Sequence, residues 1–597
     1  MLTGKNIYGE MLLTITSEKF FVEPVEDIDN SLILDRVTGS ITISNVPGSV
    51  GDAPSIKERK TIYGILGTVR LLAGQYLLVV TGRTKIGNIW RREVFRMDSA
   101  EVLCFSRSTT HLNDKQKRIE KEYISMLESI LATPHFYFSY SYDLSHTIQR
   151  LHNISPDFFE MPMYQRAEQK FVWNEYLLSE FAKNSGVSRF CLPIIHGYLS
   201  ITSCILNGKT FSLILISRRS KERAGTRLFT RGIDSNGNVA NFVETEQIVE
   251  AKFERASFVQ TRGSMPFFWQ QYPNLKLKPR PTIIQEENHT AAFSKHFETQ
   301  LMDYGRQVIV NLVDHSGSEG KLEEFYRKLV NEANHPDLKY EAFDFHRECS
   351  KLRYDRLKIL IDRLAYDLEQ MSVTMIVGDG TVISQQEGVF RTNCIDCLDR
   401  TNVVQSLLAR ANLTYILQRL TILKKGQTVE DQVGLENTFK ILWSDHADLI
   451  SIQYSGTGAL KTDYTRTGKR TKAGLIRDGI NTLVRYYKNN FLHGSRQDAL
   501  DLWLGHYRVT SEEGIVSRSP LEVKREFKYT AFPLILLVAI AMFFANLVTP
   551  NEYTTGTLLS LIFWCSMVSA TLTAIFYNGS EYVDCPRLCP LLRSPSV

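Results

Sequence analysis

Short runs of β-branched and aromatic residues, separated by glycines, fill residues 1–120. Apolar positions that alternate or cluster between turn residues are typical of β-strands. The runs that fit this pattern best are residues 11–21, 40–44, 64–69 and 75–80. Residues 114–132 change to leucine and isoleucine at three-to-four spacing among charged residues, which predicts a helix. We therefore predict a β-rich N-terminal subdomain over residues 1–120.

Strand-like and helix-like patterns alternate over residues 121–507. The clearest strand patterns lie at residues 210–217, 307–313 and 373–377, and the clearest helix patterns at residues 321–333 and 354–371. A chain that alternates the two patterns favours helices packed on a sheet. We predict an α/β (α+β) fold for this region, and hence a molecule of two parts with the β-rich part first.

Two runs near the C-terminus, residues 531–548 and 557–576, contain no charged residue. Helices of these lengths would be roughly 27 to 30 Å long, enough to cross the hydrocarbon core of a bilayer. A pair of buried core helices is the alternative, but runs that are apolar on every face favour lipid. We predict a transmembrane helix at each run.

Basic residues near these runs predict the orientation of the chain. They cluster within residues 508–530, a polar segment that we interpret as a linker, whereas the loop at residues 549–556 has no lysine or arginine. The positive-inside rule then places the region before the first run in the cytosol and the loop in the lumen. The tail, residues 577–597, would return to the cytosol.

Composition narrows the classes of function. The chain has 597 residues and a formal net charge of +5, too small for this length to indicate a nucleic-acid-binding protein. Its nine cysteines lack the density of a secreted disulfide framework and the repeated pairs of a zinc site. The N-terminus has no basic stretch followed by an apolar core, so a signal peptide is not expected. We therefore expect a cytosolic domain that meets any anionic ligand locally.

Cys394 and Arg400 form the main chemical motif of the chain. Five residues separate them, a spacing that lets a loop curl so that backbone N–H groups converge on one phosphate. Apolar residues at helical spacing follow Thr401, so the loop is expected to enter a helix N-terminus, which favours a phosphate and a thiolate. We predict Cys394 as a nucleophile and Arg400 as a bidentate ligand of the phosphate oxygens. The spacing alone is a weak signal, because it often arises by chance.

Other residues of the loop have supporting roles in this interpretation. Thr401 would donate its hydroxyl to the sulfur while a phosphocysteine is hydrolysed. Asp396 or Asp399 would act as a general acid if it is protonated beside the phosphate, and Asp399 is equally well interpreted as a structural side chain that accepts loop N–H groups. The residues expected to bind phosphate along the loop are Asn393, Ile395, Cys397 and Leu398.

The nine residues from Cys394 to Asn402, Cys-Ile-Asp-Cys-Leu-Asp-Arg-Thr-Asn, resemble the signature of the Sac family of phosphoinositide phosphatases. Further matches cover nearly the whole chain and include residues 217–227, 231–234, 239–247, 260–266 and 465–470. The resemblance is to the integral membrane branch of the endoplasmic reticulum and Golgi. It implies a Sac domain core at about residues 127–456, a cysteine-phosphatase catalytic subdomain after the β-rich part, and a C-terminal transmembrane hairpin.

The resemblance also implies a substrate and a location. It implies hydrolysis of phosphatidylinositol 4-phosphate, and more weakly of the 3-phosphate, without a metal or other cofactor. The implied partners are phosphoinositide lipids at the cytosolic face of endoplasmic reticulum and Golgi membranes, and the sequence names no protein partner. Locally basic segments at residues 218–231 and 461–472 suit an inositol phosphate or an anionic membrane surface. Their candidate contacts are Arg218, Lys461 and Lys469.

Other functions remain open at the level of sequence. A protein tyrosine phosphatase would share the cysteine-to-arginine spacing, although Asn393 stands where those enzymes usually place a histidine, and a Trp-Pro-Asp acid loop is missing. A non-catalytic membrane tether that binds phosphoinositides would not need the nucleophile. A primary redox function of Cys394 and Cys397 is disfavoured, because the spacing to Arg400 would then be accidental. A reversible protective disulfide is kept as a secondary behaviour.

Overall fold

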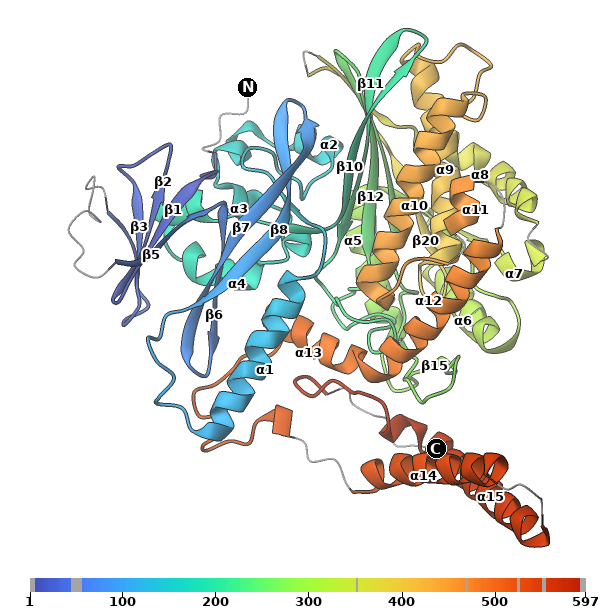
Figure 1. The fold of residues 1–597 in the computed structure, drawn as a ribbon. Coiled ribbons are helices and arrows are strands. Elements are labelled where there is room, and N and C mark those ends of the chain that lie inside the picture. The colour runs from blue at the N-terminus through green and yellow to red at the C-terminus, as the bar shows by residue number, and fades with distance from the viewer. Residues whose placement is uncertain are drawn as a thin grey trace.

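Strands dominate the first part of the chain, helices the second, and a pair of long helices ends it (Figure 1). The computed structural model describes residues 6–44, 56–350, 353–378, 380–460, 462–467, 471–522, 527–549 and 554–590. Large sheets with packed helices confirm the mixed α/β class, and the strands and helices predicted above are found with bounds shifted by a few residues.

A five-stranded antiparallel sheet begins the fold, in the order β4-β3-β2-β1-β5. Its strands are β1 Met11–Thr16, β2 Lys19–Pro24, β3 Ser31–Asp35, β4 Ile41–Ser44 and β5 Ile56–Ile62. The predicted run 11–21 is therefore two strands. The chain reverses between them, where Thr16 Oγ1 accepts a hydrogen bond from the Lys19 N–H at 2.9 Å. Leu13 and Leu34 are buried in an apolar cluster that joins this sheet to the next one.

A 13-stranded sheet runs through the rest of the protein. Its antiparallel part consists of β6 Gly64–Leu71, β7 Gly74–Ile89, β8 Arg92–Cys104, β9 Phe136–Phe138, β10 Ile195–Leu206, β11 Lys209–Arg219, β12 Val243–Glu250 and β13 Glu254–Arg262. Because β9 pairs with both β8 and β10, the sheet continues past residue 120. The β-rich first part and the region that follows it therefore share one sheet.

Strand pairing in this sheet changes from antiparallel to parallel after β13. β13 pairs in parallel with β20 (Gly388–Asn393), β20 with β16 (Arg306–Asn311), and β16 with β17 (Leu338–Ala342). Parallel strands bring their carboxyl ends to one edge of the sheet, and open α/β sheets bind ligands at such edges. The loops after β13, β16 and β20 therefore meet in one place.

Helices cover both faces of the parallel part of the sheet. Val308 and Val310 of β16 pack with α8 (Leu357–Met371), α9 (Asp399–Arg419) and α10 (Val433–Ser455). Ile309, between them, packs with α5 (His289–Tyr304) and α6 (Gly317–Ala333), as the alternation of a pleated strand requires. The remaining elements are α1 Asp114–Leu131, α2 Ile148–Asn153, α3 Met163–Arg166, α4 Glu175–Ala182, β14 Trp269–Gln270, β15 Thr282–Ile283, α7 Phe345–Glu348, β18 Thr374–Val377, β19 Val382–Ser384, α11 Thr462–Thr467, α12 Lys472–Phe491 and α13 His493–Trp503.

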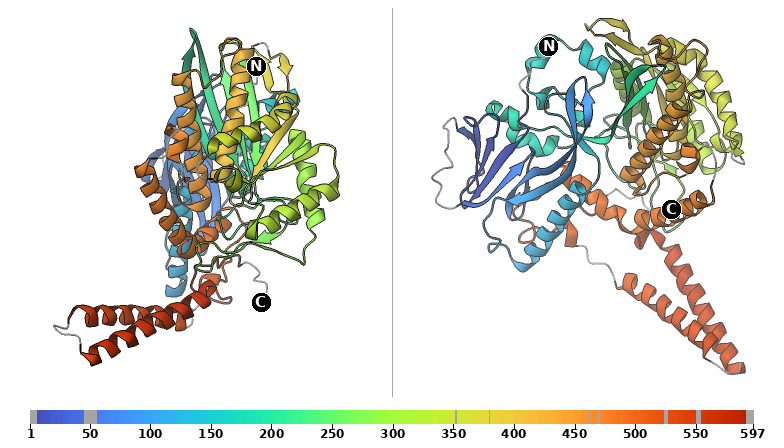
Figure 2. Two further views of the ribbon diagram at one scale, coloured as in Figure 1. Left: turned by 90° about the vertical axis from the view of Figure 1, so that its right-hand side faces the viewer. Right: turned by 45° about the horizontal axis from the view of Figure 1, so that its top comes forward.

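The two predicted apolar helices are present as α14 (Lys528–Val548) and α15 (Thr555–Tyr577). Stretches of 20 and 23 residues in them have mean hydropathies of 2.5 and 1.9, and both are long and apolar enough to cross a membrane. The two helices lie side by side and project from the rest of the molecule in both views of Figure 2. They form a hairpin whose apolar side chains face outwards.

Segments on either side of the hairpin are packed on the domain, and the first of them, residues 508–522, is the described part of the segment interpreted as a linker before α14. Val509 and Leu521 are buried in the same apolar cluster as α1. The tail returns to this cluster as well, because Leu588 is buried in it. Asp498 of α13 accepts the backbone N–H groups of Arg587 and Leu588 at 2.7 and 2.8 Å. Polar composition alone concealed these contacts, which are formed only in the tertiary structure.

Candidate active site

The segment that carries Cys394 connects β20 to α9. All residues of β20 are buried, and residues 394–398 leave its carboxyl end among the parallel strands. α9 begins at Asp399, so the loop enters a helix N-terminus as the sequence predicts. Leu398, directly before the helix, is fully buried and has no polar side-chain atom. It cannot cap the first N–H groups of α9, which remain available to an anion.

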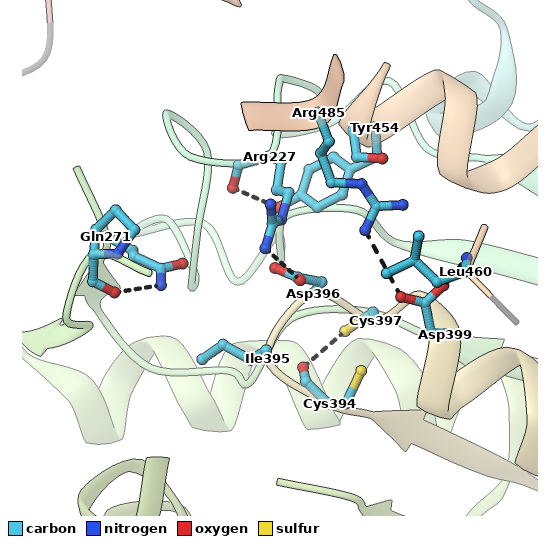
Figure 3. Close-up of polar contacts among 12 residues, drawn as sticks. Arg227, Gln271, Cys394, Ile395, Asp396, Cys397, Asp399, Tyr454, Leu460 and Arg485 are labelled. Atoms are coloured by element: carbon cyan, nitrogen blue, oxygen red, sulfur yellow. Dashed lines mark hydrogen bonds and ion pairs between the residues drawn. The ribbon is translucent and has the colours of Figure 1, made fainter. Parts of the chain in front are cut away.

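Cys394 and Thr401 meet at the start of α9. Both side chains are buried, and Thr401 Oγ1 lies 3.5 Å from Cys394 Sγ. The Cys397 thiol instead donates to the carbonyl oxygens of Gly263 and Cys394, at 3.0 and 3.3 Å (Figure 3). Burial raises the pKa of the Cys397 thiol to about 12. Cys397 is therefore a neutral donor within the loop, and Cys394 is the sulfur beside the Thr401 hydroxyl.

Two neighbouring side chains, from β16 and from the segment before β12, hold the start of the loop. Asn393 donates from Nδ2 to Asn311 Oδ1 at 2.6 Å, and the Ile395 carbonyl accepts from Arg231 Nη1 at 2.9 Å. Cys397 has a φ of 52°, a left-handed conformation that costs energy in a residue other than glycine. Such strain persists only where the surroundings enforce it, so the curl of the loop is built into the fold.

Arg400 lies in the first turn of α9 and is held by acidic side chains opposite it. Its guanidinium donates to the Glu319 carboxylate at 2.9 and 3.0 Å, to the Leu312 carbonyl at 2.9 Å, and to Asp314 at 3.3 Å. Burial lowers the pKa of Arg400, but Cys394, Glu319 and Asp314 outweigh burial and raise it well above its usual range. The guanidinium predicted to hold a phosphate is thus engaged by carboxylates in this structure.

Asp396 is paired with two arginines from a distant part of the chain. Its carboxylate accepts from Arg227 Nη2 at 2.8 Å and from Arg231 Nη2 at 2.6 Å. Burial raises the pKa of Asp396, but the two arginines outweigh burial and hold it well below its usual range. The carboxyl group is therefore ionised. The predicted protonated general acid does not fit Asp396, whose contacts instead anchor the loop.

The contacts of Asp399 fit a structural side chain that accepts a backbone N–H group, which was one of the two roles predicted for it. Its Oδ1 accepts the Leu460 N–H at 2.8 Å, and its Oδ2 lies 3.7 Å from Arg485 Nη1 (Figure 3). Because Asp399 also lines the cavity described next, the side chain both fixes a neighbouring segment and faces the site.

A cavity of about 370 Å³ opens above the loop. Cys394 and Ile395 lie in its lining, and the charged side chains around them are Arg227, Lys276, Lys278, Asp314, Glu319, Asp396, Asp399, Arg400 and Arg485. Pockets of this size accommodate a small polar molecule. Most of these residues were not predicted from the sequence, because they come from five segments that lie far apart in the chain. The matches at residues 217–227 were the available signal for Arg227.

A further buried cation lies beneath the loop and was also missed. Arg262, at the end of β13, is fully buried and donates to the Asn402 side chain and, at 3.4 Å, to the Cys397 carbonyl. Among the described residues, its Nε and Nη2 have no hydrogen-bond partner. Burial lowers the pKa of Arg262 to about 10, against the opposing effect of Cys397 and Cys394. A buried cation without a carboxylate favours an anion nearby, such as a thiolate or a phosphate.

Arg218 does not reach the cavity, which corrects its prediction as a substrate contact. It is fully buried in the sheet and pairs with Glu244 and Glu246 of β12, each at 2.8 Å. It also donates to the carbonyls of Leu144 and His146. The guanidinium is fully used by these partners, so its role is structural.

Two other predicted contacts, Lys461 and Lys469, lie outside the described residues. Over the part of the chain that the structure describes, no group of three or more His, Cys, Asp or Glu side chains is placed to hold a metal ion.

Comparison with known proteins identifies the family. The model of the SacI homology domain matches residues 63–350. Phosphatidylinositol-3-phosphatase SAC1-A of Danio rerio is 46% identical over 584 residues, 98% of each chain, and phosphatidylinositol-3-phosphatase SAC1 of Drosophila melanogaster is 47% identical over 586 residues, also 98% of each. Phosphatidylinositol-3-phosphatase SAC1 of Saccharomyces cerevisiae is 38% identical over 545 residues, which are 88% of this chain and 85% of the yeast chain. The chain therefore belongs to the Sac family, whose members carry the SacI homology domain.

Proposed function

We propose that this protein is a phosphoinositide phosphatase with a catalytic region at residues 121–507. It would hydrolyse phosphatidylinositol 4-phosphate, and the 3-phosphate, to phosphatidylinositol. The observation that carries the proposal is the meeting of Cys394, the Thr401 hydroxyl and the α9 N-terminus at the floor of a cavity that is lined by five basic and four acidic side chains. The relatives' names, which specify phosphatidylinositol-3-phosphatases, support a phosphoinositide substrate and name the 3-phosphate. The choice of the 4-phosphate rests on the family resemblance of the sequence.

The first step is a transfer of the phosphoryl group to sulfur. The Cys394 thiolate forms a bond to phosphorus while the bond from phosphorus to the inositol oxygen breaks, and that oxygen leaves with a proton. The α9 N-terminus and the buried Arg262 favour the thiolate, since both place positive charge near the loop. Two cavity side chains can supply the proton, Asp399 and His346, and substituting each in turn distinguishes them.

Arg400 has to change partners in this mechanism. Its two-point contact with Glu319 has the same fork geometry that it would offer to two oxygens of a phosphate. A bound phosphate, with more negative charge than the carboxylate, competes for the same N–H groups. Charge on the oxygens is then stabilised by a guanidinium that is already placed beside Cys394.

Hydrolysis of the phosphocysteine completes the cycle. Water attacks phosphorus, the bond from sulfur to phosphorus breaks, and the Thr401 hydroxyl donates to the departing thiolate from its position 3.5 Å away. Inorganic phosphate leaves, and the water proton returns to the acid of the first step. The loop backbone around Ile395, Cys397 and Leu398 binds the phosphate throughout in this proposal.

The hairpin supports a location for this reaction. α14 and α15 would hold the catalytic region on the cytosolic leaflet of endoplasmic reticulum and Golgi membranes, where its lipid substrate lies. A protein tyrosine phosphatase is the alternative enzyme, and a non-catalytic phosphoinositide tether the alternative without chemistry. The Thr401 contact to Cys394 Sγ favours an enzyme over a tether, because binding alone needs no nucleophile.

Cys394→Ser tests the proposal in the full-length protein. Phosphate release from phosphatidylinositol 4-phosphate, measured without metal in detergent micelles, should fall by at least about 10³-fold, because the hydroxyl is a far weaker nucleophile than a thiolate. Cys397→Ser is the matched control, since that side chain donates a hydrogen bond and should retain most of the activity. Full activity of Cys394→Ser would refute the covalent mechanism, and preference for a phosphotyrosine peptide would refute the lipid substrate.

A further inference from the structure

Helix α12 turns its polar side towards the protein and its apolar side towards solvent. Its buried residues are Gly474, Arg485, Asn489 and Asn490. Its exposed large apolar residues are Leu475, Ile476, Ile480, Leu483, Val484, Tyr487 and Phe491, followed by Leu492. An amphipathic helix of a soluble domain normally shows the reverse arrangement. We call these eight exposed residues the α12 stripe.

The side chains of the α12 stripe are unusually exposed for large apolar residues. Leu483 is 71% exposed and Ile476 is 66% exposed, and both belong to one continuous helical face. Patches of this kind mark surfaces that contact a partner or a membrane, because exposing them to water is unfavourable. The buried polar side of α12 explains its orientation, since Arg485 and Asn489 line the cavity and need its polar environment.

A second exposed element stands beside α12 at the rim of the cavity. Leu277 is 65% exposed between Lys276 and Lys278, and all three line the cavity. The segment is fastened to α12, because the Tyr486 hydroxyl donates to the Leu275 carbonyl at 2.8 Å and the Leu275 N–H donates to Asn490 Oδ1 at 3.3 Å. α12 and this rim therefore present apolar side chains on both sides of one opening.

The same surface continues into the base of the apolar hairpin. Gly579, just after α15, is packed so closely on the Asn274 carbonyl that an added Cβ would lie 2.2 Å from its oxygen. The Asp584 N–H donates to the carbonyl of Asn490, near the end of α12, at 2.7 Å. In Figure 1, the C-terminal end of α12 lies on the side of the molecule that carries α14 and α15. The stripe thus adjoins the place where the chain enters the membrane.

Charge on this surface is predominantly positive. Apart from the buried Arg485, α12 contains three basic residues, Lys472, Arg477 and Lys488, and one acidic residue, Asp478. Lys276 and Lys278 add two exposed cations at the rim. Basic residues that flank an apolar face are typical of helices that lie in the headgroup region of anionic membranes.

We propose that the α12 stripe and Leu277 insert into the cytosolic leaflet of the membrane that holds the hairpin. The occupant of this surface is anionic phospholipid, which meets apolar side chains with its acyl chains and the lysines with its headgroups. Insertion would face the cavity towards the leaflet, so that a phosphorylated headgroup enters while its acyl chains stay in the bilayer. This last point rests on the proposed function, whereas insertion itself does not.

Activity on two forms of substrate tests the orientation. The full-length double variant Ile476→Gln, Leu483→Gln is reconstituted in vesicles that contain phosphatidylserine and phosphatidylinositol 4-phosphate. We expect kcat/KM on this embedded lipid to fall about 10- to 100-fold, because each of the two apolar side chains loses a transfer energy worth up to about a factor of ten. Hydrolysis of a water-soluble, short-chain form of the lipid in detergent should stay within about twofold, because neither residue lines the cavity.

Fluorescence quenching tests the contact itself without using activity. Leu483→Trp is reconstituted in vesicles whose acyl chains carry bromine, and its added fluorescence should be lost relative to unbrominated vesicles. Ile205→Trp is the matched control, since this residue is 76% exposed at the β10–β11 turn, at the opposite end of the domain in Figure 1. Its fluorescence should remain unchanged, and the parent protein supplies the background from its own tryptophans.

Four outcomes separate the explanations. Quenching of Leu483→Trp with a selective fall on embedded lipid supports the proposal. Quenching in a protein without phosphatase activity supports insertion and refutes the proposed function. An absence of quenching refutes insertion, whatever the activity. A shift from dimer to monomer in the double variant, without quenching, would refute it in favour of a second copy as the occupant.

Discussion

Arg218 and Arg400 are both largely buried and both paired with two carboxylates, yet their partners differ in origin. Glu244 and Glu246 approach Arg218 from the neighbouring strand of the same sheet. Glu319 and Asp314 approach Arg400 across the cavity, from α6 and the loop before it. Strands fixed by a ladder of backbone hydrogen bonds cannot release such a pair, whereas partners across a cavity can exchange for a ligand. Burial and charge alone therefore do not distinguish a structural arginine from a functional one.

The largest effect that we expect from this comparison is on stability. Arg218→Ala would leave Glu244 and Glu246 buried without a counter-charge, and breaking a buried pair in this way costs about 3–5 kcal/mol. Urea denaturation in detergent, followed by tryptophan fluorescence, measures the loss in the free energy of unfolding. Arg218→Met combined with Glu244→Gln and Glu246→Gln should recover part of it. A loss below about 1 kcal/mol in the single variant would contradict the structural role.

Arg400→Lys should show the opposite profile, with lost activity and retained stability. Lysine keeps the positive charge but cannot bind two oxygens of a phosphate in the fork geometry of arginine. We expect kcat for phosphatidylinositol 4-phosphate to fall about 10²–10³-fold, as in the removal of one strong donor to a transition-state oxygen. Steady-state kinetics alongside the denaturation measurement makes the comparison direct. A variant that lost stability and kept its kcat would reverse the roles assigned to the two arginines.

The smallest of the three effects concerns pH. Because the pKa of Asp396 is held well below its usual range, its ion pairs with Arg227 and Arg231 contribute stability that is fully present above about pH 4. That contribution is lost only as the pH falls through the folded-state pKa. Asp396→Asn should lower kcat/KM about 10- to 100-fold by loosening the loop. The shape of its profile between pH 5 and 8 should match that of the parent protein. If Asp396 were the general acid, a limb of the profile would disappear.

Local patterns predicted the elements of this fold well, and tertiary contacts explain where they did not. The helix after Cys394 was predicted because its apolar residues recur at helical spacing, and it begins directly after the loop. Residues 508–522 were interpreted as a linker because their composition is polar. The structure instead buries Glu513, whose carboxylate accepts hydrogen bonds from the Tyr123 and Ser519 hydroxyls. A buried carboxylate with such partners has no signature in its own segment.

The site was predictable to the extent that it is continuous in sequence. Cys394, Arg400 and Thr401 were found because they lie within one loop and the helix that follows it. Arg227, Arg262 and Arg485 were not, because only the folded sheet and α12 bring them to the same loop. A signal against Arg218 was present, since Glu244 and Glu246 lie two residues apart and therefore on one face of a strand. Two acids at that spacing indicate a buried basic partner on the next strand.

The hairpin is attached to the domain at both of its ends, by the packed segment before α14 and by the tail after α15. If the hairpin were attached to the domain at only one end, the domain could rotate freely about that point. Two anchors define an axis, about which the domain can tilt but not turn over. With the proposed function, such a protein would meet its lipid substrate by lateral diffusion within its own bilayer. A facing membrane would come within reach only if one of the two attachments detached.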